Sequence, residues 1–383
     1  MNKDQLTAIS PIDGRYGEQT SQLKSIFSEY GLMRYRLLVE IEWFIHLSNQ
    51  SSINELPKLS ANMKKNIFKI HKNFSLQEAN KVKRIEAKTN HDVKAIEYYL
   101  KDAISLFPSL KKYREFIHFG CTSEDINNIA YALMIRDASK KIFEGKYKEF
   151  ASQLRHKAHK YASVAMISRT HGQIATPTTL GKEFANFLFR IEKILEVLEK
   201  IHIRGKINGA VGNYNAHLIA YPKANWEKIS ESFVTTLGLS WAPYTTQVEP
   251  KDSLSKLFHS YQRLNNVLID FSRDIWGYIS LGYFSQKTKQ NEIGSSTMPH
   301  KINPIDFENA EGNLGISNAY FSHLTSTMNI SRWQRDLSDS TLMRNIGTTL
   351  GHSLIALNSL NKGLTKLKVN RLNINNDLHM SYE

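Results

Sequence analysis

The chain has 383 residues, of which 41% are hydrophobic and 22% charged, a composition typical of a globular protein with room for two or three domains. It contains no run of eighteen apolar residues, and residues 1–10 lack the apolar core of a signal peptide, so we expect neither a membrane span nor secretion. The single cysteine, Cys121, cannot form an internal disulfide, which favours the reducing cytoplasm.

The formal net charge is +14, from 50 Lys and Arg against 36 Asp and Glu. A solvated basic surface, a nucleic-acid partner and a cleft for a small polyanionic substrate would each fit this excess. The basic residues are spread along the chain, with no zinc-finger spacing, RNP motif or basic tail. We therefore expect no nucleic-acid partner, although charge alone does not choose between the other two.

Helical periodicity dominates the predicted elements. The first part of the chain is mixed and ends near Phe107-Pro108, which predicts an N-terminal helical domain over 1–111 and a central helical-bundle domain over 112–364. Three later stretches carry apolar residues at steps of three or four, the spacing of helices packed along one face. In chain order these seams are Phe143-Tyr147-Phe150-Leu154-Ala158-Tyr161, Phe184-Phe187-Ile191-Ile194-Leu198-Ile201 and Leu254-Leu257-Tyr261-Leu264-Leu268-Phe271-Ile275-Tyr278. Such long stripes must be buried against one another, so we predict an all-α fold with a central bundle of long helices.

Three polar, glycine-containing stretches interrupt the predicted helices, at 168–177, 205–217 and 294–304. The last reads GSSTMPHKINP, and its two prolines and its hydroxyl side chains are typical of a mobile surface loop. His300 and Lys301 in this loop are able to bind an anion, or simply keep the loop soluble.

The polar clusters, taken one at a time, do not define a reaction. His171, in Thr170-His171-Gly172, and the segment Asn90-His91-Asp92 are each more often structural than catalytic in such settings. The run Thr122-Ser123-Glu124-Asp125 has the pattern of a capped helix N-terminus, where free backbone amides also bind anions. There is no Gly-x-Ser-x-Gly elbow, zinc spacing or glycine-rich phosphate loop, so we expect no metal and no cofactor.

The loop at 294–304 nevertheless resembles the GSSxMPxKxNP signature of the fumarase/aspartase superfamily. Further segments, spread over essentially the whole chain, resemble the bacterial adenylosuccinate lyases of that superfamily. These segments are SPIDGRY at 10–16, TNHDVK at 89–94, FGCTSEDINN at 119–128, SRTHGQ at 168–173, KINGAVGNYN at 206–215 and RWQRD at 332–336.

The resemblance implies a fumarase/aspartase-like fold, whose central bundle assembles into the helical core of a homotetramer with active sites shared between subunits. It also implies a carbon–nitrogen lyase of purine biosynthesis that needs no cofactor. The implied reactions are β-elimination of fumarate from adenylosuccinate, giving AMP, and from succinyl-aminoimidazole-carboxamide ribotide, giving AICAR. In this family pattern His171 matches the catalytic acid and Ser295 the catalytic base.

The binding residues are implied in the same way, position by position. Arg15 and Tyr16 match a phosphate-binding pair, and Thr122 and Ser123 match residues that hold the succinyl carboxylate. The other expected substrate contacts are Asn90, His91, Asp92, Gln247, Lys301, Asn309, Arg335, Ser340 and Arg344.

The chain departs from the family pattern at its C-terminal end, where residues 365–383 are expected to be only the start of a third helical domain. A catalytically inactive scaffold is therefore one alternative. Another lyase of the superfamily, such as argininosuccinate lyase, is a second, and the 206–215 segment and Gly14-Arg15-Tyr16 disfavour it only through resemblance.

Overall fold

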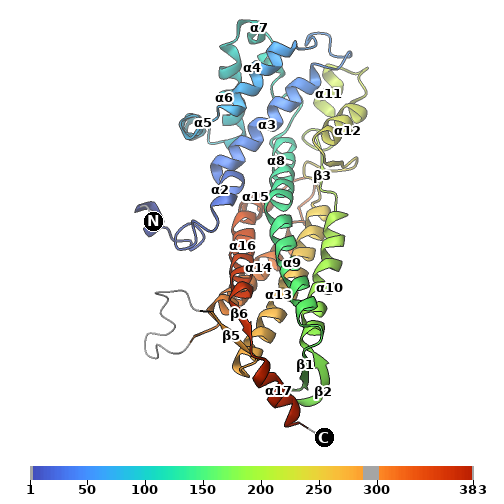
Figure 1. Ribbon diagram of the computed structural model, residues 1–383. Coiled ribbons are helices and arrows are strands. Elements are labelled where there is room, and N and C mark those ends of the chain that lie inside the picture. The colour runs from blue at the N-terminus through green and yellow to red at the C-terminus, as the bar shows by residue number, and fades with distance from the viewer. Residues whose placement is uncertain (1–2, 288–301, 382–383) are drawn as a thin grey trace.

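The computed structural model describes residues 3–287 and 302–381 and is a long helical bundle with smaller helices at one end (Figure 1). Within these ranges no helix is long and apolar enough to cross a membrane. The N-terminal helices are α1 (Lys3–Leu6), α2 (Ser21–Phe27), α3 (Glu29–Leu47), α4 (Ala61–Lys72), α5 (Leu76–Thr89), α6 (Asp92–Ser105), α7 (Pro108–Lys111) and the 3-10 turn η1 (Arg114–Phe116).

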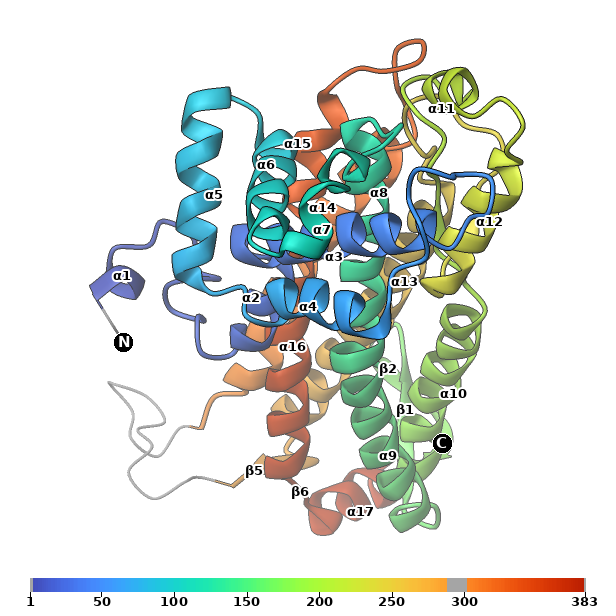
Figure 2. The same cartoon turned by 90° about the horizontal axis from the view of Figure 1, so that it is seen from above.

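Helix α3 organises this N-terminal layer because it buries twelve of its nineteen residues, among them the charged Arg36 and Glu40. Figure 2 shows α5 and α6 side by side near one end of α3, with α11 and α12 at its other end. The Tyr30 hydroxyl at the start of α3 donates to the Phe74 carbonyl, at 2.6 Å, ahead of α5. His46 in the last turn of α3 lies 3.1 Å from the Ile229 carbonyl of α12.

Six helices form the long bundle: α8 (Ser123–Ala138), α9 (Glu144–Lys160), α10 (Leu180–Glu199), α13 (Asp252–Ser280), α14 (Ile305–Thr327) and α16 (Ile346–Lys366). The three predicted seams fall on α9, α10 and α13, so the prediction of an all-α fold with a long-helix bundle is confirmed. Phe271 of α13 shows how the seams meet. Its ring lies 5.4 Å from that of Phe150 on α9, 5.2 Å from that of Phe187 on α10 and 6.3 Å from that of Phe307 on α14.

A polar cluster fixes the register of α13, α14 and α16. The Asn265 amide donates to the hydroxyls of Ser317 and Ser353, both at 3.3 Å, and these hydroxyls lie 2.8 Å apart. All three side chains are buried, so a shift of one helix along another would leave them without partners.

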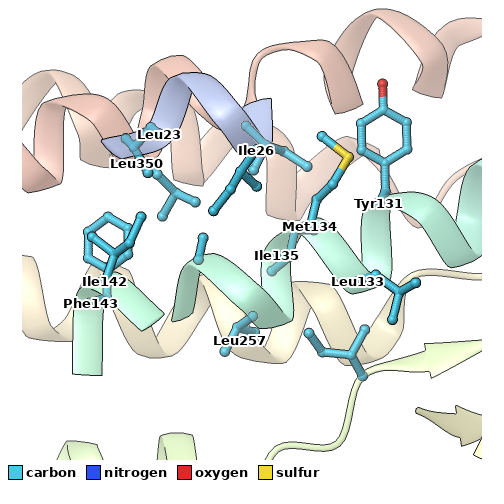
Figure 3. Close-up of a cluster of buried hydrophobic side chains, with 14 of the residues drawn as sticks. Leu23, Ile26, Tyr131, Leu133, Met134, Ile135, Ile142, Phe143, Leu257 and Leu350 are labelled. Carbon is cyan, nitrogen blue, oxygen red and sulfur yellow. The ribbon is translucent and has the colours of Figure 1, made fainter. Parts of the chain in front are cut away.

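Helix α8 is the most enclosed of the six. Figure 3 shows its residues Tyr131, Leu133, Met134 and Ile135 among side chains of the neighbouring helices α2, α13 and α16. A single π-helical turn, η2 (Ser139–Phe143), joins α8 to α9 without breaking the rod.

The remaining helices are α11 (Asn215–Ala220), α12 (Trp226–Thr236), α15 (Ser338–Arg344) and α17 (Arg371–His379). Three small two-stranded sheets accompany them: β1 (Ala165–Thr170) with β2 (Gln173–Thr179), β3 (Arg204–Gly205) with β4 (Ser240–Trp241), and β5 (Phe284–Gln286) with β6 (Leu367–Val369). Of these pairs, only β3 with β4 is parallel.

The polar stretch at 168–177, predicted to interrupt the helices, forms most of the β1–β2 hairpin. Thr170 pairs with Gln173 across a two-residue turn in which His171 has φ 55° and Gly172 has φ 76°. Positive φ at both central positions defines the turn whose twist matches antiparallel strands. His171 is therefore displayed at an exposed hairpin tip.

Candidate active site

The first turn of α8 is where several of the predicted site residues meet. Thr122 caps the helix, and its backbone N–H donates to the Asp125 carboxylate at 2.8 Å, as the capping pattern predicted. The next three side chains, Ser123, Glu124 and Asp125, each interact with a different element of the fold.

Ser123 lies beside the segment Asn90-His91-Asp92, where α5 ends and α6 begins. Asn90 ends α5 in the left-handed conformation, at φ 50°, and so turns the chain toward α6. His91 then caps α6, because its Nδ1 accepts the backbone N–H of Lys94 at 3.1 Å. A neutral ring that accepts through Nδ1 carries its proton on Nε2, which lies 3.4 Å from the Ser123 hydroxyl. The fold thus brings together four predicted site residues: Asn90, His91, Thr122 and Ser123.

Asp92 connects this corner to α15. Its carboxylate is 2.8 Å from a guanidinium nitrogen of Arg36 and 2.8 Å from one of Arg344, and Arg344 also contacts Glu29 at 2.9 Å. Burial would raise the pKa of Asp92, but the two guanidinium groups and the Val93 amide hold that pKa below its usual value.

Arg344 also lines a small cavity, of about 160 Å³, between α2, α3, α8 and α15. Glu29 and Tyr131 line the same cavity, and burial raises the pKa of the Tyr131 phenol to about 12. The phenol is therefore a neutral hydrogen-bond donor beside the guanidinium group.

Arg335 belongs to a second charged network, with Glu124, Lys251 and Asp339. Asp339 accepts from Arg335 at 2.6 Å and from Lys251 at 2.7 Å, while Glu124 lies 3.8 Å and 3.7 Å from the same two cations. Burial raises the pKa of Glu124, which shares these cations with Asp339. Ser340 follows directly, and its N–H donates to the Leu337 carbonyl at 3.1 Å in the first turn of α15.

Gln247 connects two loops at this end of the bundle. Its side-chain amide donates to the Ala210 carbonyl at 2.8 Å, and its backbone N–H donates to the Gln334 carbonyl at 3.2 Å, next to Arg335. Gln247 therefore joins the 205–217 stretch to the segment before α15.

Tyr16 and Asn309 form a separate pair, between the N-terminal segment and α14. The Asn309 amide donates to the Tyr16 hydroxyl at 3.1 Å, and the Asn309 oxygen accepts from Ser359 at 2.8 Å. The Arg15 guanidinium lies 5.9 Å from the centre of the Tyr16 ring and is exposed.

His171 lies apart from all of these residues. Its hairpin is near α17 at one end of the bundle, whereas the first turns of α6 and α8 are toward the opposite end (Figure 1). Ser295 and Lys301 lie outside the described residues. Within 3–287 and 302–381, no three His, Cys, Asp or Glu side chains are grouped as ligands for a metal ion.

The sequence interpretation missed several charged residues around these contacts. Four of them are buried: Arg36, Lys206, Lys251 and Asp339. Arg36 pairs with Asp92, Lys206 pairs with Asp125, and Lys251 pairs with Asp339. Asp125 was identified as part of a cap, but its pairing with Lys206 had no signal in the sequence, because the partners are far apart along the chain.

Comparison with solved structures identifies the fold. The fold is similar to 3-carboxy-cis,cis-muconate lactonizing enzyme from Pseudomonas putida (TM-score 0.76, 20% identity, 94% of this chain and 78% of that chain). It is also similar to fumarate lyase from Mesorhizobium sp. BNC1 (TM-score 0.76, 17% identity, 94% and 78%). At these identities the likeness establishes the fold. Residues 14–316 match the family model described as "Lyase", so the chain is a member of that lyase class.

Sequence comparison is more specific. Residues 331–383 match the model "Adenylosuccinate lyase C-terminal". The chain is 51% identical to adenylosuccinate lyase of Escherichia coli K12 over all 383 residues, which is 84% of that relative. It is 52% identical to that of Vibrio cholerae O395 (97% of this chain, 82% of the relative) and 53% to that of Buchnera aphidicola from Schizaphis graminum (97% and 81%). The chain belongs to the adenylosuccinate lyase family.

Proposed function

We propose that the chain eliminates fumarate from adenylosuccinate, giving AMP, and from succinyl-aminoimidazole-carboxamide ribotide, giving AICAR. The observation that carries this proposal is the identity of 51% to an adenylosuccinate lyase along the full length of the chain. A base takes the proton from the succinyl carbon β to the leaving nitrogen, and that electron pair forms the carbon–carbon double bond. The carbon–nitrogen bond breaks, and an acid protonates the departing amine.

Ser295 is the proposed base and His171 the proposed acid. The proton removed lies next to a carboxylate and is weakly acidic, so the dianion that forms needs preorganised donors and cations. A serine hydroxyl is a poor base unless its alkoxide is stabilised when the site closes. Imidazole is suited to protonating an amine near neutral pH, and an exposed position on a hairpin tip leaves His171 free to reach a substrate.

The binding roles divide by charge and place. Arg15, Tyr16, Arg335, Ser340 and Arg344 hold the phosphate and ribose. The Arg344 side chain is 40% exposed beside its carboxylate partners, so one side of its guanidinium remains open to an anion.

The other binding residues contact the succinyl group and the rest of the substrate. Thr122 and Ser123 hold the succinyl carboxylate at the N-terminus of α8, where backbone amides favour an anion. Lys301 and Asn309 contact the fumaryl side. Asn90, His91, Asp92 and Gln247 orient the remainder of the substrate.

The active form is a homotetramer that shares its active sites between subunits. Within one chain the His171 hairpin lies near the opposite end of the bundle from the first turn of α8, which supports a site assembled from more than one chain. Phe189 on α10, Trp276 on α13 and Ile316 on α14 are exposed by 61%, 49% and 47%, as expected of helices that pack against further helices.

We also propose a division into a helical domain at 1–111, a bundle domain at 112–364 and a separate C-terminal unit beginning at 365. The location is the cytoplasm, which agrees with the free thiol of Cys121.

The test is a side-by-side measurement of fumarate release from adenylosuccinate, the imidazole ribotide and argininosuccinate by the purified chain. We expect turnover of the first two substrates only. Release from argininosuccinate alone would replace this function with that of another lyase of the superfamily. No release by a folded tetramer would indicate an inactive scaffold.

A further inference from the structure

The carboxylate of Asp125 is fully buried, accepts three backbone hydrogen bonds and forms one ion pair. Its Oδ1 accepts from the Asn208 N–H at 3.0 Å and pairs with the Lys206 ammonium group at 2.8 Å. Its Oδ2 accepts from the Thr122 N–H at 2.8 Å and the Gly209 N–H at 3.1 Å. The residue thus closes its own helix cap and, with the same two oxygens, binds a loop more than eighty residues away in the sequence.

Lys206 balances the charge of this carboxylate and is itself fully buried. Its ammonium group also donates to the Gly209 carbonyl at 3.2 Å, so both partners of the ion pair hold the same short loop. Burial of such a pair costs desolvation free energy, and the three backbone N–H groups on the carboxylate and the carbonyl on the ammonium group offset that cost.

On one side, this pair fixes residues that belong to the proposed substrate site. The Thr122 N–H bonds directly to Asp125, and the next residue, Ser123, faces His91. The orientation of the first turn of α8, and of the carboxylate-binding hydroxyls on it, therefore depends on Asp125.

On the other side, the pair fixes the loop that holds Gln247. The Asn208 side chain donates to the Thr245 hydroxyl at 2.8 Å, and the Ala210 carbonyl accepts from the Gln247 amide at 2.8 Å. The loop approaches so closely that a Cβ on Gly212 would lie 2.1 Å from the Thr245 carbonyl oxygen. A displacement of this loop would therefore also displace Gln247.

We propose that Asp125 and Lys206 are positioning residues, which keep Thr122 and Ser123 on α8 in register with Gln247 on the facing loop so that both sides of the site contact one substrate. This inference rests on the proposed function. Reacting groups must be held within a fraction of an ångström, so a loop released from α8 weakens substrate binding although neither positioning residue touches the substrate.

The test compares two isosteric substitutions in the same helix. In Asp125→Asn, an NH₂ group replaces one oxygen, and in either orientation it faces two donors and cannot accept from them. The control, Asp137→Asn, alters another buried α8 carboxylate, which pairs with Arg136 and Lys141 at 2.8 Å and accepts from Tyr35 but contacts none of the site segments.

Both variants lose thermal stability, but only Asp125→Asn should raise KM for adenylosuccinate, by tenfold or more, while Asp137→Asn keeps KM within twofold of wild type. Equal KM values in two folded variants would overturn the positioning role. If Asp125→Asn does not fold, Thr245→Val serves instead. It removes the hydroxyl that accepts from Asn208 and donates to the Thr246 carbonyl, while the Asp125–Lys206 pair stays in place. This variant should raise KM two- to fivefold, and an unchanged KM would overturn the inference as well. Failure of wild type and Asp137→Asn to release fumarate would instead refute the proposed function, and this inference with it.

Discussion

His217 on α11 makes the stability of the fold sensitive to acid. The side chain is fully buried, and neither ring nitrogen has a hydrogen-bond partner among the described residues. Aromatic rings enclose it, and the ring of Trp226 is the nearest of them, at 4.6 Å between centroids. Burial lowers the pKa of His217 from 6.5 to about 4, so the folded chain holds a neutral imidazole.

The sign of the effect follows from this lowered pKa. The unfolded chain takes up a proton as the pH falls below about 6.5, whereas the folded chain does so only near pH 4. The contribution of the neutral His217 side chain to the free energy of unfolding is therefore complete above pH 6.5 and is lost as the pH falls from 6.5 to 4. A shift from 6.5 to about 4 corresponds to a total of about 3 kcal/mol, of which about 2 kcal/mol is lost by pH 5.

The assay is urea unfolding at pH 8 and pH 5 of wild type and of His217→Leu, at equal protein concentration. The variant replaces the imidazole with an apolar side chain of similar size, so its free energy of unfolding should fall by about 2 kcal/mol less between the two pH values. His156→Leu, at an exposed position on α9, serves as the control and should follow wild type. An equal loss for wild type and His217→Leu would refute the reasoning.

Four further substitutions test the site and the core. His171→Ala and Ser295→Ala should each lower turnover by two to three orders of magnitude while nucleotide binding, measured by calorimetry, persists; near-normal turnover in either variant would remove that residue from its role. Arg15→Ala should raise KM with little change in kcat, since a phosphate contact is made equally before and during the reaction, and an effect on kcat alone would contradict this. Phe271→Ala should lower the free energy of unfolding by about 3–5 kcal/mol, because its ring contacts three neighbouring helices, and a loss below about 1 kcal/mol in urea unfolding would show that the site collapses freely.

The bundle was predictable because its helices repeat apolar residues over many turns. The seam from Leu254 to Tyr278 coincides with most of α13, whose ends at Asp252 and Ser280 lie only two residues beyond it. The β1–β2 hairpin was not predictable in the same way. Most of its second strand is exposed or half-exposed on both faces, so the sequence there has no alternation of apolar and polar residues.

Family motifs supplied the candidate site residues, but nothing in the sequence indicated the contacts that support them. The run Thr122-Ser123-Glu124-Asp125 predicted a capped helix N-terminus, and the structure shows the bond from the Thr122 N–H to Asp125 within one helical turn. The pairs Asp125–Lys206 and Lys251–Asp339 join residues more than eighty positions apart, and only the folded chain brings them together. A lysine has the same appearance in a sequence whether it is buried in an ion pair or solvated.

The most direct test of the proposed reaction is the ultraviolet absorbance of adenylosuccinate incubated with the purified 383-residue chain, with the products identified by mass spectrometry. We predict conversion to AMP and fumarate in equal amounts. An unchanged spectrum from a chain that is folded and tetrameric would contradict the proposed function.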